Sequence, residues 1–256
     1  MSEAPAPFRT ALVTGAARRI GAAIATDLAA HGFAVAIHHW RSQDEADALA
    51  GRITTAGGRA MTVRANLRDG DETAGLIEAV RQRLGPVDLL VNNASLFAAD
   101  DARRHEPDKW EGHFAIHARA PAQLAGLFAA QAELAAGLIV NIVDQRVWRL
   151  NPNYFSYTLS KSVLWTQTQT LAQALAPKVR VNAIGPGPTV KSERQSEADF
   201  AAQIAGLPLR RGPRLAEFGA TIRYFFETPS LTGQMIALDG GQHLAWETPD
   251  IAGIPE

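Results

Sequence analysis

The amino-acid sequence predicts a doubly wound α/β fold, in which helices cover both faces of a parallel sheet. Short β-branched apolar runs alternate with longer Ala-rich stretches of helical spacing along the chain. Two of these runs, Leu89-Leu90-Val91 and Leu138-Ile139-Val140, are apolar at every position, as expected for strands that are buried on both faces. No linker or shift in composition divides the 256 residues, so we expect one domain over 1–256.

The alternation predicts seven strands and the helices that connect them. Strands are expected where β-branched residues cluster between turn signals, and helices where apolar residues recur every three or four positions. The expected strands lie at 11–14, 33–38, 61–65, 87–91, 138–143, 179–184 and 235–238. The expected helices lie at 20–30, from about 42, from about 69, near 108 and 119, at 154–175 and from about 215.

Three segments outside these elements also carry predictions. The stretch from about 186 to 207 is rich in Pro, Gly, Ser and charged residues, so we expect a long loop or mobile lid there. It follows the sixth strand, at the edge of the sheet where ligands bind in such folds, and is predicted to cover a substrate. We expect residues 1–8 to form a flexible N-terminus and residues 242–256 a C-terminal tail.

Composition and charge argue against several classes of function. Lys and Arg total 25 against 26 Asp and Glu, a net charge of −1 that offers no field for nucleic acid or an anionic membrane. The most apolar stretch, 118–138, is interrupted by polar residues and a proline, and the N-terminus lacks the pattern of a signal peptide. Cysteine is absent, which suits a reducing compartment. We therefore expect a cytoplasmic protein that binds neither nucleic acid nor a membrane.

The junction between the first strand and the first helix predicts a dinucleotide site. It reads Thr14-Gly15-Ala16-Ala17-Arg18-Arg19-Ile20-Gly21, and a tight Gly turn at a helix N-terminus can hold a pyrophosphate. The middle glycine of such loops is missing, and Arg19 stands in its place. Its guanidinium can replace lost backbone contacts with a charge-assisted bond to phosphate. A simple strand-to-helix turn is the alternative.

The end of the second strand favours NADPH over NADH. The segment reads His38-His39-Trp40-Arg41-Ser42, where an NAD-binding fold would place a carboxylate for the ribose 2′-hydroxyl. A cation and a hydroxyl at this point fit a 2′-phosphate instead. The alternative is a solvated Arg41 at the start of the next helix, with Ser42 as its N-cap.

A third motif, Tyr157-Thr158-Leu159-Ser160-Lys161, lies on a long predicted helix. A spacing of four residues places the phenol and the ammonium on one face, about 6 Å apart along the axis. Because a nearby cation favours the phenolate, we expect a lowered pKa for Tyr157 and proton exchange with a substrate. Taken alone, the motif is more often a surface pair, but its place after the fifth strand of a dinucleotide fold favours the catalytic interpretation.

Together these motifs resemble the classical short-chain dehydrogenase/reductase family over essentially the whole chain. The matching elements are Thr14 to Gly21, Asn92-Asn93-Ala94, Tyr157 with Lys161, Pro186-Gly187 and Asp239-Gly240-Gly241. The resemblance implies a single-domain Rossmann fold with strand order 3-2-1-4-5-6-7, an NADP cofactor and a homotetramer.

Three departures from the family pattern resemble the pteridine reductases and the related dihydromonapterin/dihydrofolate reductases. Arg18-Arg19 replaces the usual glycine, Ser95 stands where most members have glycine, and Asp144 replaces the usual catalytic serine. The resemblance implies that Tyr157, Lys161 and Asp144 form the catalytic set, with Lys161 also holding the nicotinamide ribose. A carboxyl at position 144 suits an imine, whose ring nitrogen must gain a proton. Otherwise Asp144 caps the segment that follows the strand.

The same resemblance assigns residues to two ligands. The implied cofactor contacts are Gly15, Arg18, Arg19, Ile20, His38, His39, Trp40, Arg41, Ser42, Asn66, Leu67, Asn93, Ala94, Ser95, Tyr157, Lys161, Pro186 and Gly187. The implied substrate contacts are Arg19, Ser95, Phe97, Asp144 and Tyr157. Phe97 would stack on the pterin, and its alternative is a place in the core.

His117 stands where most of the family has a catalytic Asn, which leaves the proton supply open. A histidine there can relay protons itself, or it can be an inert residue on the helix surface. His113 and His117 lie four residues apart but lack a third ligand at zinc spacing, and His31 and His105 suggest no zinc pair, so no metal site is predicted.

The sequence thus predicts an NADPH-dependent reductase of a pterin C=N bond. Two alternatives stay open: an NADPH-dependent carbonyl reductase of the same family, and a catalytically silent NADPH-binding regulator.

Overall fold

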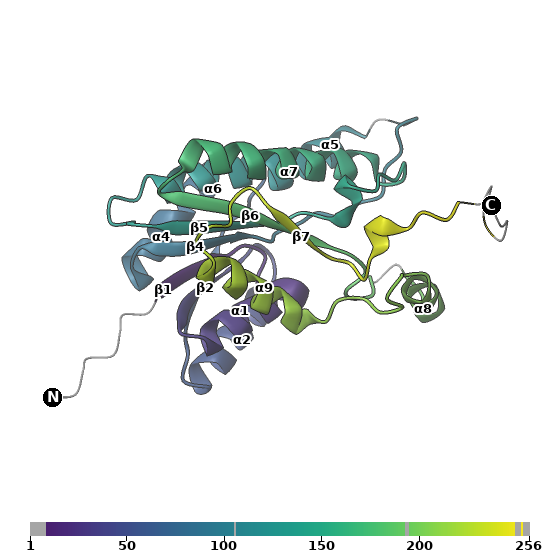
Figure 1. Cartoon of the computed structure of the whole chain (residues 1–256). Coiled ribbons are helices and arrows are strands. Elements are labelled where there is room, and N and C mark those ends of the chain that lie inside the picture. Colours follow the sequence, from purple (N-terminus) through teal and green to yellow (C-terminus); the bar gives the residue numbers. More distant parts are fainter. Residues whose placement is uncertain (1–8, 105, 193–194, 249–251, 253–256) are drawn as a thin grey trace.

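The fold is a seven-stranded parallel sheet with helices on both faces (Figure 1). The computed structural model describes residues 9–104, 106–192, 195–248 and 252. The expected N-terminus at 1–8, His105 and most of the expected tail beyond residue 248 lie outside the described residues. The strand order is β3-β2-β1-β4-β5-β6-β7 and every neighbouring pair is parallel, which confirms the predicted fold class.

The strands and helices follow the predicted alternation. The strands are β1 (Arg9–Val13), β2 (Phe33–His39), β3 (Arg59–Arg64), β4 (Val87–Asn92), β5 (Gly137–Ile142), β6 (Val179–Pro186) and β7 (Met235–Leu238). The helices are α1 (Arg19–Ala30), α2 (Gln43–Thr55), α3 (Gly70–Ala74), α4 (Leu76–Leu84), α5 (Pro107–Phe114), α6 (Ala120–Ala129), α7 (Phe155–Leu175), α8 (Glu197–Ala205) and α9 (Leu215–Glu227). Within the described part of the chain, no helix is both long enough and apolar enough to cross a membrane.

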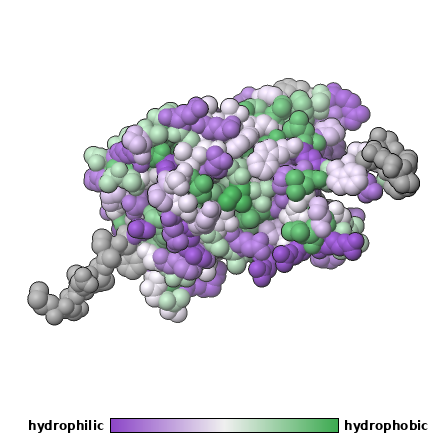
Figure 2. Space-filling model, viewed as in Figure 1, coloured by the Kyte–Doolittle hydropathy of each residue, from purple (hydrophilic) through white to green (hydrophobic). Residues whose placement is uncertain are grey.

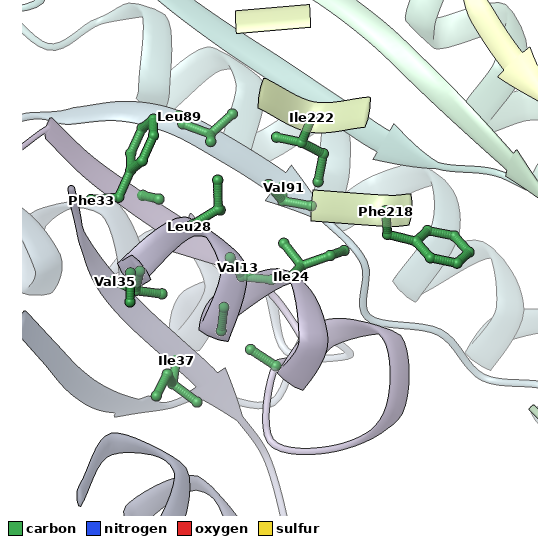
Figure 3. Packing of buried hydrophobic residues seen from close by; sticks show 14 of the residues in the cluster. Val13, Ile24, Leu28, Phe33, Val35, Ile37, Leu89, Val91, Phe218 and Ile222 are labelled. Carbon is green, nitrogen blue, oxygen red and sulfur yellow. The ribbon is translucent and has the colours of Figure 1, made fainter. Parts of the chain in front are cut away.

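Two hydrophobic clusters lie on opposite faces of the sheet. Successive side chains of a strand point to opposite faces, so Val13 of β1 joins one cluster and its neighbour Leu12 the other. On the first face, Ile24 of α1 and Phe218 of α9 cover the strands (Figure 3). The other face is covered by α4, α6 and α7, so both layers hold the sheet rigid beneath its carboxyl edge.

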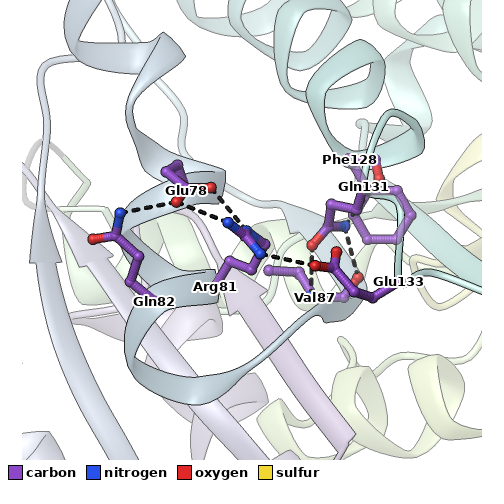
Figure 4. Close-up of polar contacts among 7 residues, drawn as sticks. All are labelled: Glu78, Arg81, Gln82, Val87, Phe128, Gln131 and Glu133. Atoms are coloured by element: carbon purple, nitrogen blue, oxygen red, sulfur yellow. Dashed lines mark hydrogen bonds and ion pairs between the residues drawn. The ribbon is translucent and has the colours of Figure 1, made fainter.

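The start of β4 is anchored to the end of α6 by one buried amide (Figure 4). Gln131 accepts a hydrogen bond from the Val87 N–H at 2.8 Å and donates to the carbonyl oxygens of Val87 and Phe128. Nearby, Arg81 bridges Glu78 and Glu133 at the surface, where ion pairs contribute about 0–1 kcal/mol each. The buried amide is therefore the stronger restraint on β4, whose other end enters the candidate site.

The segment predicted as a loop at 186–207 contains the helix α8, so that prediction was wrong for its second half. Ser196 caps this helix by accepting from the Asp199 N–H at 3.0 Å, and acidic residues in its first turn suit the helix dipole. None of its residues is fully buried. A helix that packs so little carries a weak hydrophobic pattern, which is why the sequence analysis missed it.

Candidate active site

The carboxyl edge of the sheet opens into a cavity of about 1100 Å³. It is lined by most of the residues that the sequence singled out: Gly15, Arg18, Arg19, Ile20, His38, Trp40, Arg41, Asn66, Leu67, Asn93, Ala94, Ser95, Phe97, Asp144, Tyr157, Lys161, Pro186 and Gly187. His39 and Ser42 do not line it. His39 follows His38 on β2 and so points to the other face of the sheet.

The turn between β1 and α1 presses closely against the chain that follows β4. Gly15 has a φ of +60°, and a Cβ built there would lie 2.8 Å from the Ala94 Cα. Asn93 Nδ2 donates to the carbonyl oxygens of Thr14 and Gly15, at 2.8 and 3.0 Å. Glycine is therefore required at position 15, both for the left-handed backbone and for the close approach.

The N-terminus of α1 faces the cavity without a side-chain cap. Its N-cap residue, Arg18, makes no capping hydrogen bond, and no acidic residue lies in the first turn. The next residue, Arg19, has a φ of 54° and donates to the carbonyl oxygens of Val190 and Lys191, at 2.9 and 3.1 Å. Arg19 thus joins the turn to the segment that follows β6, beside a helix end suited to bind an anion.

His38 holds this turn to the end of β3. Its Nδ1 accepts from the Gly15 N–H at 3.0 Å, so the ring proton lies on Nε2, which is 3.0 Å from the Ala65 carbonyl oxygen and donates to it. The side chain is buried, and burial lowers the pKa of His38 to about 4. The imidazole is therefore neutral throughout the physiological range.

We expect this histidine to make the fold sensitive to acid. In the unfolded chain the pKa of a histidine is near 6.5, so below that pH the unfolded state binds the proton that folded His38 rejects. The free energy of unfolding should fall as the pH drops from 6.5 towards 4, by up to about 3 kcal/mol from this residue. Urea unfolding at pH 7 and pH 4.5 measures the loss, and His38→Gln should reduce it. An unchanged pH dependence in that variant would contradict the assignment.

At the far end of the cavity, Trp40 and Arg41 line the place where the sequence predicts a 2′-phosphate. The Arg64 guanidinium lies 4.3 Å from the Trp40 ring centroid and fixes the indole. Ser42 occupies the N-cap position of α2, but its side chain makes no capping hydrogen bond. Among the described residues that line the cavity, Asp144 is the sole carboxylate, and it lies at the other end.

The three side chains predicted to be catalytic come together at the end of β5 and on α7. The Tyr157 hydroxyl donates to Asp144 Oδ2 at 2.8 Å, and the Arg146 N–H donates to Asp144 Oδ1 at 2.9 Å. Lys161 Nζ donates to the Ile142 carbonyl oxygen at 2.7 Å and lies 5.8 Å from the Tyr157 ring centroid. Asp144 also caps the turn that follows β5, as the alternative interpretation expected. The same side chain therefore caps this turn and lines the cavity.

The pKa of Tyr157 is raised well above its usual value, contrary to the expected lowering. Burial disfavours the phenolate, and the charge of Asp144 and its hydrogen bond hold the phenol proton in place. The Lys161 ammonium, 5.8 Å from the ring centroid, does not offset these effects, and burial lowers the pKa of Lys161 itself to about 8. Tyr157 is therefore a neutral hydrogen-bond donor at neutral pH.

His117 is buried and is not the helix-surface residue that one alternative described. It lies in a π-helical turn, Ala115–Arg119, where Nε2 accepts from the Leu96 N–H at 3.2 Å and lies 2.9 Å from Ser95 Oγ. Its proton therefore lies on Nδ1, which donates to Ser160 Oγ at 2.8 Å. Burial, with the Lys161 charge, holds its pKa well below 6.5.

His113, one helical turn earlier, makes equivalent contacts to a backbone N–H and to a serine of α7. Nothing in the sequence indicated this structural role. His113 Nε2 accepts from the Ala98 N–H at 3.3 Å and its Nδ1 donates to Ser156 Oγ at 2.7 Å. The two histidines thus tie the segment 95–98 to α7. Their spacing of four residues was visible in the sequence, but it does not reveal which backbone groups they bind.

An aromatic platform forms beside the Asp144–Tyr157 pair. The rings of Phe97 and Tyr154 are stacked with centroids 4.3 Å apart, and Tyr157 meets Phe97 edge-on at 4.8 Å. Phe97 is 37% exposed and lines the cavity, so it is not a core residue. The Arg146 guanidinium lies 5.4 Å from its ring centroid. The lining residues that the sequence did not single out include Gln145, Tyr154, Phe200, Gln203 and Gln242.

Known proteins share both this sequence pattern and this fold. The short chain dehydrogenase family model matches residues 9–200. The solved structure of FolM alternative dihydrofolate reductase 1 from Brucella canis, complexed with NADP, is 58% identical; the match covers 95% of this chain and 97% of that one, with a TM-score of 0.92. The corresponding Brucella suis structure, also in complex with NADP, is 58% identical over 94% and 98%, with a TM-score of 0.92.

A more distant relative has a different named activity. The 3-oxoacyl-[acyl-carrier-protein] reductase of Synechocystis sp. is 31% identical, and the match covers 91% of this chain and 96% of that protein. The family model spans most of the chain, and the resemblance extends over the whole sheet. This chain belongs to the short-chain dehydrogenase family.

Proposed function

We propose that this protein is an NADPH-dependent reductase of the C=N bond of a dihydropterin or dihydrofolate. The observation that carries the proposal is the carboxyl–phenol pair, Asp144 and Tyr157, at 2.8 Å beside the Phe97 platform. A carboxyl group in this place suits a substrate whose ring nitrogen gains a proton. The 58% identity to two proteins named as dihydrofolate reductases, both crystallised with NADP, supports the same substrate class.

The residues of the cavity fit NADPH. The pyrophosphate would lie against the Gly15 turn and the uncapped end of α1, with Arg18 and Arg19 as cations. Arg41, in a region of the cavity without a carboxylate, would hold the 2′-phosphate. Lys161 carries three N–H donors, enough to keep its bond to Ile142 and to hold ribose hydroxyls. When bound, the nicotinamide supplies the hydride.

The side chains of this protein hold the substrate and supply the proton. Phe97, which lines the cavity and is partly exposed, can stack against a heterocycle, since aromatic rings favour offset stacking. Tyr157 keeps its proton at neutral pH because burial and Asp144 raise its pKa. The Asp144 carboxylate can take up this phenol proton, or one from water, and pass it to the ring nitrogen, so that Tyr157 is reprotonated from solvent afterwards.

We expect NADPH binding to weaken as the pH rises through about 8. Burial lowers the pKa of Lys161 to about 8, so its ammonium is lost above that pH in the free enzyme and with it the attraction for the anionic cofactor. Fluorescence titration of NADPH between pH 6.5 and 9.5 measures the effect. Lys161→Met should bind weakly at every pH and lose the transition. A transition of the same size in that variant would assign it to another group.

The proposed function is tested by following NADPH oxidation with dihydrobiopterin, dihydromonapterin and dihydrofolate, beside a panel of ketones. Turnover of at least one pterin, inhibited by methotrexate, is expected. Turnover of ketones alone would overturn the proposal.

That second outcome defines the alternative function, an NADPH-dependent carbonyl reductase. It is favoured by the 31% identity to a 3-oxoacyl-[acyl-carrier-protein] reductase. The carboxyl at position 144 argues for the pterin, because a serine hydroxyl at that position would serve a ketone oxygen better.

We also propose a cytoplasmic homotetramer. The absence of cysteine suits a reducing compartment. The short helix α5 and the long helix α7 lie side by side on one face of the sheet, where Leu159 is exposed, and can offer a surface for a second copy (Figure 1). Figure 2 shows green apolar residues among the polar surface of the molecule. Light scattering coupled to gel filtration tests this: a monomer at micromolar concentration would contradict it.

A further inference from the structure

A second, smaller cavity of about 240 Å³ adjoins the main one. The two share Gln145, Arg146, Gln203 and Gln242 in their walls, so they meet beside the aromatic platform. Arg149 lines the second cavity alone, whereas Asp144 lines the main one alone. A molecule held at Asp144 can therefore extend past Arg146 towards Arg149.

The second cavity is basic. Arg146 and Arg149 line it, and none of its described lining residues is acidic. The backbone N–H groups of Trp148 and Arg149 both donate to the Gln145 carbonyl oxygen, so the chain forms a helical turn here. Arg146 and Arg149, three residues apart in the sequence, both lie on this turn. Residues at this spacing lie on the same side of a turn, so both guanidinium groups can reach one ligand.

Arg146 holds an unused hydrogen-bond donor at the junction. Its Nη1 is buried and has no hydrogen-bond partner among the residues that the structure describes, while the guanidinium lies 5.0 Å from the Tyr154 ring centroid. A buried donor without a partner costs free energy. Because a guanidinium carries only N–H donors, the missing partner must be a hydrogen-bond acceptor. An anionic oxygen is the partner that a guanidinium binds most strongly, because its fork matches carboxylate and phosphate groups.

We propose that this second cavity is a subsite for an anionic tail of the substrate, a carboxylate or phosphate group joined to the heterocycle. The inference rests on the proposed function, because it places the heterocycle between Asp144 and Phe97. Arg146 binds the tail where it leaves the main cavity, and Arg149 binds its charged end. Gln203, on the segment after β6, and Gln242 supply neutral amides for a polar spacer. The enzyme then prefers charged pterins over neutral ones.

The test compares three substrates with NADPH in excess: dihydrofolate carries carboxylates, dihydroneopterin phosphate carries a phosphate, and dihydrobiopterin carries neither. Arg149→Gln should lower kcat/KM for at least one charged substrate about tenfold more than for dihydrobiopterin. Arg149→Lys should restore part of that preference. Arg52→Gln, which removes an exposed arginine of α2 outside both cavities, should leave the ratio of the three values unchanged.

Ionic strength provides a second measurement. Because Arg149 is exposed, its attraction for the tail should weaken as the salt concentration is raised. The ratio of kcat/KM for charged over neutral substrates should therefore fall with salt in the wild type. In Arg149→Gln this ratio should not change with salt. The charged substrate that responds identifies carboxylate or phosphate as the ligand. Equal losses for charged and neutral substrates would overturn the subsite. If the wild type reduces none of the three, the proposed function fails first.

Discussion

Asp144→Asn is expected to lower kcat for dihydropterin reduction by two to four orders of magnitude, the range that general acid–base groups contribute. An amide has nearly the same shape as the carboxyl: its single oxygen can still accept from the Arg146 N–H, while its NH2 group faces the Tyr157 hydroxyl and donates to it. It cannot transfer a proton to a ring nitrogen. Steady-state and single-turnover kinetics with NADPH and a dihydropterin measure the loss, and Asp44→Asn, an exposed aspartate of α2, serves as the control.

The pH profile separates a catalytic role for Asp144 from a structural one. The negative charge of Asp144 contributes to the raised pKa of Tyr157, so a neutral amide should let that pKa fall. The alkaline limb of kcat should then begin at a lower pH in Asp144→Asn than in the wild type. A variant with wild-type kcat would show that the proton comes from another group. Asp144→Ser should favour ketones over pterins, since it restores the hydroxyl of the commoner family pattern.

Gly21→Ala is expected to lower the free energy of unfolding by about 1–3 kcal/mol, as overpacking of a close contact does. A Cβ at this position would lie 2.4 Å from the Gly15 carbonyl oxygen, 2.5 Å from Asn93 Nδ2 and 2.8 Å from the Ala16 Cα. Most of these atoms are backbone, so the clash can be relieved only by moving the turn between β1 and α1. NADPH affinity should fall together with stability.

Gly51→Ala is the matched control, because the same change is made in an exposed helix. Gly51 lies in the middle of α2, and an added Cβ there meets nothing within 4 Å. Alanine should raise the free energy of unfolding by about 0.5–1 kcal/mol, since glycine is the poorer helix former. Urea unfolding of both variants checks the pair. If the free energy of unfolding changed with the same sign in both variants, close packing at Gly21 would not be the cause of the destabilisation.

The local pattern was enough to predict most of the fold. Apolar runs and their turn residues predicted all seven strands within a few residues, and β7 at its observed bounds. These signals are local, because a strand buried on both faces must be apolar at nearly every position. The helix α8 escaped prediction for the same reason: it buries no residue fully and so leaves little periodic signal.

The sequence by itself determined the doubly wound sheet, the glycine turn after β1 and the spacing that places Tyr157 and Lys161 on one helix face. That Asp144 joins them was implied by the family resemblance. Tertiary structure alone decided the protonation states and the partners of these groups. The pKa of Tyr157 is raised because burial and the Asp144 charge, thirteen residues away in the chain, act through space. His113 and His117 bind the backbone of the segment 95–98, and Arg146 meets Tyr154 and Phe97. Residue types and spacing do not encode such contacts, because desolvation and charge depend on what the folded chain brings together.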